Sequence, residues 1–352
     1  MASEKGSARA PAKQAAAAGG IPTWLMVALW FTTTAVCSTL SKSAFLTSSK
    51  ATMLDAGHAR PDAKRAASLG LLVFQFGGAM PCAFIAAALS AKGGVSSVFG
   101  SLKRLVPAYL EASVLLLLAN GLNTVGLQAA GVTVTYVLKS LIPLFTLLTR
   151  FFFHGERFEA RVIAALGLTV LGVCVAVAGA KGVGGASLAV TELLAPLGSA
   201  IAQTALNLRS KAAQQRTGAD ASMALLAMMI TCSAITVPCF VLTGHASSLA
   251  TAATQSGAAA SLGAISLAAA AAYYSEYGLN FALIARVSPV TFSIADIARR
   301  AATIMFGAVV VDQNVTANKA VGVGLAFCGA AWYSRLSSAA SAKAASESGK
   351  KV

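Results

Sequence analysis

The sequence predicts an all-α integral membrane protein with ten transmembrane helices, arranged as two inverted five-helix repeats. Hydrophobic residues make up 57% of its 352 residues and charged residues 11%, against about 45–50% and 25% in soluble domains. Ten apolar runs have the length of a membrane span, and a glycine pattern in the fifth run recurs in the tenth. A bilayer must therefore be the solvent for most of the chain.

The predicted spans are runs of 19 to 25 residues, and a helix of about 20 residues crosses a hydrocarbon core of about 30 Å. They lie at residues 22–41, 66–90, 106–128, 131–153, 160–180, 187–208, 222–243, 261–285, 289–311 and 320–338. Only Ala129 and Ala130 separate the third span from the fourth, so that boundary rests on run length and on Gly131.

The membrane domain therefore covers residues 22–338, between polar, alanine-rich tails at 1–21 and 339–352 that are predicted to be disordered. The apolar run after the first tail continues to full span length, unlike a short cleaved signal, while a very short transit peptide stays an open alternative. Lysine and arginine concentrate in the tails and in the loops on the same side. The positive-inside rule then places both termini in the cytosol.

The pattern Gly-Leu-x-x-x-Gly begins at Gly167 in the fifth span and again at Gly324 in the tenth, 157 residues later. Since five is odd, the second half enters the membrane inverted, and the repeats cover about 22–180 and 187–338. Glycine is common wherever membrane helices pack closely, so chance similarity is the competing interpretation.

Three cations fall inside predicted spans: Lys139, Arg299 and Arg300. They lie about 12–18 Å from the nearer span end. Each cation at that depth costs about 2.5–3.5 kcal/mol. They must therefore face a wet cavity or anionic partners inside the bundle.

Two interpretations of these cations compete. Asp296, four residues before Arg300, and Glu276, at mid-depth in the eighth span, would neutralise two of the three as static ion pairs. Alternatively, the cations form a net positive pocket for a phosphate, in which guanidinium groups make bidentate contacts and lysine supplies a point charge.

Asn120, Asn123, Tyr136 and Glu276 complete the candidate substrate site. The uncharged side chains suit hydrogen bonds to sugar hydroxyls and suit bridges between helices equally well. The six cysteines stand singly and the three histidines fall in loops, which predicts no metal, no cofactor and no catalytic residues. The +15 net charge is spread over loops and tails, so no nucleic-acid partner is expected.

Two stretches resemble the sugar-phosphate (triose-phosphate) translocator family of the drug/metabolite transporter superfamily. Residues 135–143 (TYVLKSLIP) are similar to its T-H-x-x-K-[SA]-x-x-P motif, and residues 286–291 (RVSPVT), followed by Arg299 and Arg300, are similar to its R-V-[SA]-P-x-T and later K-R. The resemblance extends over essentially all ten spans. It implies ten helices in inverted repeats and strict antiport, with the phosphate clamped by Lys139, Arg299 and Arg300.

The sequence departs from the family pattern at three positions. Arg299 replaces the lysine of the pair, Tyr136 replaces a histidine, and Glu276 replaces a tyrosine. The last change adds a carboxylate, which tunes the pocket for a less charged sugar phosphate or couples a proton.

The predicted function is antiport, by alternating access, of a phosphorylated sugar or related organic phosphate against inorganic phosphate. The alternatives are a nucleotide-sugar/nucleoside monophosphate exchanger and a non-transporting sensor of the same fold; an enzyme is disfavoured. The expected location is an organelle membrane, either Golgi or another endomembrane or the plastid envelope. Both monomer and homodimer stay open.

Overall fold

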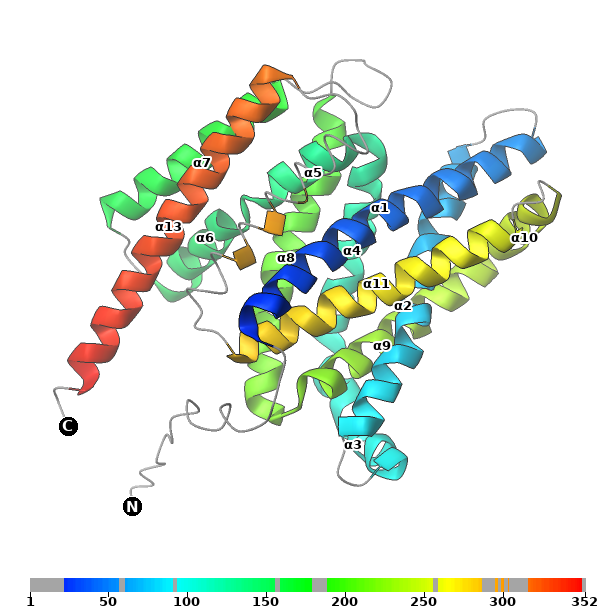
Figure 1. The fold of residues 1–352 in the computed structure, drawn as a ribbon, viewed down its shortest axis with the longest axis horizontal. Helices are drawn as coiled ribbons and strands as arrows, with labels where there is room; N and C mark the ends of the chain where they lie inside the picture. Colours follow the sequence, from blue (N-terminus) through cyan, green and yellow to red (C-terminus); the bar gives the residue numbers. More distant parts are fainter. Residues whose placement is uncertain are drawn as a thin grey trace.

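A computed structural model describes residues 22–56, 61–90, 94–155, 159–178, 189–255, 259–286 and 316–349, together with residues 295–296, 299–300 and 303. Every element in this part of the chain is an α-helix (Figure 1). The helices are α1 (Thr23–Ala56), α2 (Pro61–Ser90), α3 (Gly94–Ala108), α4 (Leu110–Ala129), α5 (Gly131–Lys139), α6 (Ile142–His154), α7 (Ala160–Ala178), α8 (Val190–Thr217), α9 (Ala221–Leu242), α10 (His245–Gln255), α11 (Ala259–Arg286) and α13 (Ala317–Gly349).

Four of the described helices contain stretches long and apolar enough to cross a membrane. These stretches are Thr23–Ser41, Ser68–Ser90, Leu110–Ala129 and Ala221–Leu242, and shorter apolar stretches cover Val134–Thr149 and Ala160–Ala176. They coincide with predicted spans 1, 2, 3, 7, 4 and 5. The protein is therefore a multi-pass membrane protein. The ninth predicted span (289–311) lies mostly outside the described residues.

The helices pair in a regular way. The most extensive contacts join α7 with α13, α4 with α8, α1 with α11, and α2 with α9 (Figure 1). Three segments lie in the lower half of Figure 1: the first turn of α1, the last turns of α13 and the connection from α8 to α9. The last turns of α1 lie at the upper right, as does α10. Pairs of helices distant in sequence therefore build the bundle.

Local signals explain several helix ends. Gly131 begins α5 with φ 80°, a left-handed conformation that glycine adopts without strain, and this confirms the predicted boundary between the third and fourth spans. Gly218, at φ 61°, ends α8 with its N–H bonded to the carbonyl of Gln214. Asp220 then caps α9, because its side chain accepts a hydrogen bond from the N–H of Ser222 at 3.2 Å.

Helices extend beyond the predicted spans into segments that were predicted to be loops or a disordered tail. α1 continues to Ala56, well beyond residue 41, and the loop predicted between the seventh and eighth spans contains α10. Residues 339–349 were predicted to be disordered but continue α13, since their many alanines favour a helix. The apolar runs located the membrane segments, but helices extend past them wherever helix propensity persists.

Glycines let α7 and α13 approach closely. A Cβ added to Gly322 would lie 2.6 Å from the Cα of Ala176, and one added to Gly329 would lie 2.5 Å from the N of Thr169. Real Cβ atoms do not approach backbone so closely, so a larger residue must force the two helices apart. Small residues have this role in many membrane helix pairs.

Gly329→Ala is therefore expected to lower the free energy of unfolding by about 1–3 kcal/mol, the usual cost of overpacking. Gly324→Ala, in the same helix, is the matched control, because an added Cβ there meets nothing within 4 Å. Thermal unfolding of both purified variants in detergent checks this. Equal unfolding temperatures for the two variants would show that the close approach is not needed for stability.

Candidate functional site

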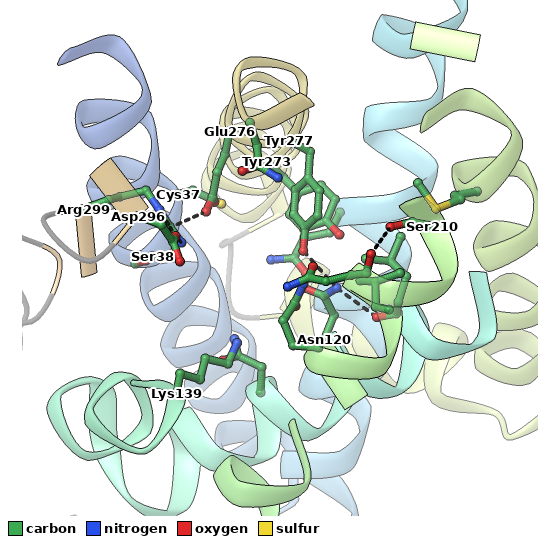
Figure 2. A pocket seen from close by; sticks show the side chains of 18 of the residues that line it. Cys37, Ser38, Asn120, Lys139, Ser210, Tyr273, Glu276, Tyr277, Asp296 and Arg299 are labelled. Carbon is green, nitrogen blue, oxygen red and sulfur yellow. Dashed lines mark hydrogen bonds and ion pairs between the residues drawn. The ribbon is translucent and has the colours of Figure 1, made fainter. Parts of the chain in front are cut away.

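A cavity of about 570 Å³ lies inside the bundle, bordered by α1, α2, α4, α5, α8, α9 and α11 and by residues 296, 299 and 300 (Figure 2). All seven residues predicted as the candidate site line it: Asn120, Asn123, Tyr136, Lys139, Glu276, Arg299 and Arg300. They come from segments up to 180 residues apart in the chain. The fold therefore gathers the seven candidate residues around one cavity.

Lys139 is the last residue of α5, and its chain reaches into the cavity (Figure 2). Its Nζ lies 5.7 Å from the centre of the Tyr136 ring, within the range of a cation–π contact. The Tyr136 hydroxyl is in turn hydrogen-bonded to Ser38 Oγ at 2.8 Å. Among the residues that the structure describes, no carboxylate lies within ion-pair distance of Lys139.

Arg299 is held by two carboxylates. Its Nη2 lies 2.7 Å from Asp296 Oδ1, and its Nη1 lies 3.1 Å from Glu276 Oε1. Nη1 also lies 3.3 Å from Thr34 Oγ1, and the guanidinium carbon lies 4.7 Å from the centre of the Trp30 ring. These contacts fix the guanidinium plane against α1 and α11.

Arg300 makes a different set of contacts. Its Nε and Nη2 donate to Asp296 Oδ2 at 3.0 and 2.9 Å, and its Nη1 donates to the backbone carbonyl of Lys139 at 2.9 Å. The carboxylates thus pair with both arginines, as the static ion-pair interpretation expects. The two arginines and the two carboxylates balance, so Lys139 carries the remaining formal charge of +1 in this cluster. Lys211 on α8 also lines the cavity and adds a further cation outside the cluster.

Uncharged polar groups occupy the centre of the cavity (Figure 2). Asn120 Nδ2 donates to the Leu116 carbonyl at 2.9 Å and to the Tyr277 hydroxyl at 3.4 Å. Asn123 Oδ1 is buried and has no hydrogen-bond partner among the described residues. A buried amide oxygen without a donor is costly, so this acceptor is available to a ligand hydroxyl or to water.

A polar stripe on α8, which was not predicted from the sequence, also faces the cavity. Gln203, Asn207, Ser210, Lys211 and Gln214 follow one another at intervals of one to four residues, and all of them line the cavity. Ser210 lies at the end of the cavity opposite Arg299 (Figure 2). Helical periodicity was the available signal, but the predicted span ended at residue 208. The same polar residues keep α8 out of the set of apolar candidate spans.

Comparison with known proteins identifies the family. The profile of the Triose-phosphate Transporter family matches residues 80–334. The chain belongs to this family. Membership makes the protein a membrane transporter of phosphate-linked solutes, whose relatives are transporters and not enzymes.

One solved structure, described only as the crystal structure of a protein, is 18% identical in sequence. The match covers 89% of this chain and 95% of that chain, with a TM-score of 0.51, so it bears on the fold alone. A comparison with curated protein sequences gives no match.

Proposed function

We propose that the protein is an obligate antiporter that exchanges a phosphorylated sugar or related organic phosphate for inorganic phosphate by alternating access. The observation that carries this proposal is the Lys139 ammonium group in a cavity within the membrane domain. It lines the same cavity as two guanidinium groups and has no carboxylate partner among the described residues. A phosphate supplies the missing negative charge, and Lys139, Arg299 and Arg300 bind it.

The charge balance also explains why exchange is coupled. An empty cluster keeps an unbalanced cation in a low-dielectric cavity, which disfavours closure of the helices around it. A bound phosphate removes that cost, so the loaded protein closes and reopens on the other side more readily than the empty one. Transport of one anion across the membrane then requires that a second anion be carried in the opposite direction.

Ten spans in two inverted five-helix repeats provide the two states. In an inverted repeat, each helix of the first half corresponds to one helix of the second half. Exchanging the corresponding helices turns the α1–α11 pair into the α8–α4 pair, and it leaves the α7–α13 and α2–α9 pairs unchanged. The observed pairing supports this arrangement. Asn120 and Tyr277, which are hydrogen-bonded at 3.4 Å, are also 157 residues apart, the offset of the glycine pattern.

The glycine contacts support the same offset. Gly172 approaches Ala326 and the carbonyl of Gly322, and Gly329 approaches Thr169 and the carbonyl of Ala165. Adding 157 to the residue number in the first half and subtracting 157 from those in the second half converts the first set of contacts into the second. If the two glycine patterns were similar only by chance, their contacts would not be expected to match in this way.

A nucleotide-sugar/nucleoside monophosphate exchanger is the second candidate. The cavity of about 570 Å³ falls among pockets of about 300–1,000 Å³ that enclose drug-sized ligands. The amides of α8 offer it donors and acceptors, and Lys211 adds a cation among them. Asn120 and Asn123 would contact the sugar in either case.

Exchange in proteoliposomes tests the function. Liposomes preloaded with phosphate are expected to take up labelled sugar phosphates, while unloaded liposomes are not. Nucleotide sugars taken up in exchange for nucleoside monophosphate, with no phosphate exchange, would favour the second candidate. Absence of any exchange would overturn both.

We also propose an organelle membrane, Golgi or other endomembrane or plastid envelope, with both termini in the cytosol. The lack of lysine and arginine in residues 244–260 assigns α10 to the lumen or intermembrane space. A cysteine introduced at Thr254 in a cysteine-free background should resist impermeant maleimide added to the cytosolic face of intact vesicles. Cysteine at Arg216 is the control and should react. Reaction at Thr254 would reverse the orientation.

A further inference from the structure

The helix of the fourth predicted span is interrupted directly after Lys139. α5 ends at Lys139 and α6 begins at Ile142, with Pro143 inside its first turn. In a continuous helix the N–H of residue 143 would donate to the carbonyl of residue 139. Proline has no N–H, and its ring crowds that carbonyl. Pro143 therefore leaves the Lys139 carbonyl without its intrahelical donor.

Tighter backbone bonds close the end of α5 around this carbonyl. The N–H of Ser140 donates to Val137 at 3.0 Å, and the N–H of Leu141 donates to Leu138 at 3.1 Å. These bonds span three residues, as at many helix ends. They satisfy the carbonyls before Lys139 but not that of Lys139.

Arg300 supplies the missing donor. Its Nη1 lies 2.9 Å from the Lys139 carbonyl oxygen, and the residues are 161 positions apart. The carbonyl end of a helix carries a partial negative charge, which a cation stabilises. Nε and Nη2 of the same guanidinium bind Asp296, so one planar group joins α5 to the segment that carries Arg299.

We infer that Pro143 is a positioning residue for the anion site. Because Pro143 frees the Lys139 carbonyl, Arg300 binds it and sets the distance between the Lys139 ammonium and the arginine pair. This inference rests on the proposed function, in which those cations bind the phosphate. It also gives Arg300 a task that lysine cannot perform, since one ammonium cannot reproduce a fork bonded to two groups.

A double-mutant cycle tests the inference with phosphate exchange as the readout. Pro143→Ala restores a backbone N–H to position 143, and the KM for phosphate is expected to rise about tenfold, the effect of losing a charged hydrogen bond. Arg300→Lys in the wild-type background is expected to raise KM at least tenfold. In the Pro143→Ala background the same substitution should raise KM by a clearly smaller factor, because the part of its effect that acts through the Lys139 carbonyl is already lost.

Pro238→Ala is the matched control, because Pro238 also lies inside a helix, α9, and does not line the cavity. It should leave KM unchanged, and the double variant with Arg300→Lys should have the same KM as Arg300→Lys alone. The same four proteins can be compared by their thermal unfolding temperatures, a measurement that does not depend on transport. Pro143→Ala alone should not lower the unfolding temperature, because alanine completes the helix. Pro143→Leu serves as a second variant if the alanine protein does not fold.

The outcomes separate the two proposals. If the wild-type protein shows no phosphate exchange, the proposed function fails, and coupling in the unfolding temperature still supports the tie between Pro143 and Arg300. If exchange is present but the effects of Pro143→Ala and Arg300→Lys are independent, multiplying in KM and adding in the unfolding temperature, Pro143 has no positioning role.

Discussion

Replacing Lys139 with methionine is expected to abolish phosphate exchange and, at the same time, to raise the thermal unfolding temperature. The structure describes no carboxylate beside Lys139, so removing its charge leaves no buried anion unpaired. It also removes a cation that costs about 2.5–3.5 kcal/mol at the mid-membrane depth predicted from the sequence. Stability should therefore increase while the site loses its unbalanced charge.

The expected loss of exchange is large. Removing one partner of a buried charge pair costs about 2–5 kcal/mol, and every 1.4 kcal/mol is about tenfold in affinity. The exchange rate at a limiting phosphate concentration should thus fall roughly 30- to several-thousand-fold. Initial rates in proteoliposomes and unfolding in detergent measure the two effects on the same preparation.

Lys103→Met provides the matched control, because Lys103 is exposed on α3 and does not line the cavity. It should leave both exchange and unfolding temperature unchanged. A Lys139→Met protein that exchanged phosphate at the wild-type rate would refute the anion site, and one with a lowered unfolding temperature would assign Lys139 a structural role.

The seven candidate site residues could be assigned to one site from sequence, and all seven line the same cavity in the structure. The physical reason is the cost of polar groups in hydrocarbon. Lys139 and Glu276 can only face the interior of a bundle, whatever the details of the helices. One of the two competing interpretations made Asp296 and Glu276 the ion-pair partners of two of the three cations, and in the structure both carboxylates pair with arginines.

Geometry that depends on tertiary contacts could not be predicted in this way. A hydropathy pattern reports where the bilayer lies, so it missed the continuation of α1 to Ala56 and the cavity-facing residues of α8 beyond residue 208. Sequence also could not show which carboxylate each arginine binds, or that the broken helix after Lys139 leaves a carbonyl for Arg300. The bond from Arg300 to the Lys139 carbonyl joins residues 161 positions apart, and the ion pair of Arg299 with Glu276 joins two different segments, 23 positions apart.

Replacing Glu276 with glutamine is expected to shift substrate preference toward dianionic phosphates. Glutamine keeps an oxygen that can accept the hydrogen bond from Arg299, now 3.1 Å from Glu276 Oε1, but it removes one negative charge. The formal charge of the cluster then rises from +1 to +2. Additional positive charge in a low-dielectric cavity favours the more highly charged ligand.

The pH dependence follows from the substrate. Phosphate monoesters have a second pKa near 6, so the dianion predominates above about pH 6 and the monoanion below it. A site with charge +2 should select the dianion, and the pH optimum of exchange should move upward. We expect the ratio of dianion to monoanion affinity to increase about tenfold, which corresponds to about 1.4 kcal/mol.

Competition by a panel of phosphates, measured about one unit on either side of that pKa, quantifies the shift. Glu111→Gln is the matched control, since it makes the same chemical change at a solvent-exposed ion pair with Arg209, in which both side chains are 60% exposed. Exposed pairs contribute little, so this variant should keep the wild-type ranking and pH optimum.

Glu276→Tyr extends the test, because the resembling family carries a tyrosine at this position. It should move selectivity toward triose phosphates, with Trp30 still contacting Arg299 from the other side. If Glu276 served only as a structural partner of Arg299, both substitutions would lower the unfolding temperature and the yield of protein, and the substrate ranking and pH profile would stay as in the wild type. An unchanged ranking in both variants therefore excludes a role for Glu276 in selectivity, whereas a shifted ranking with retained stability assigns that role to its charge.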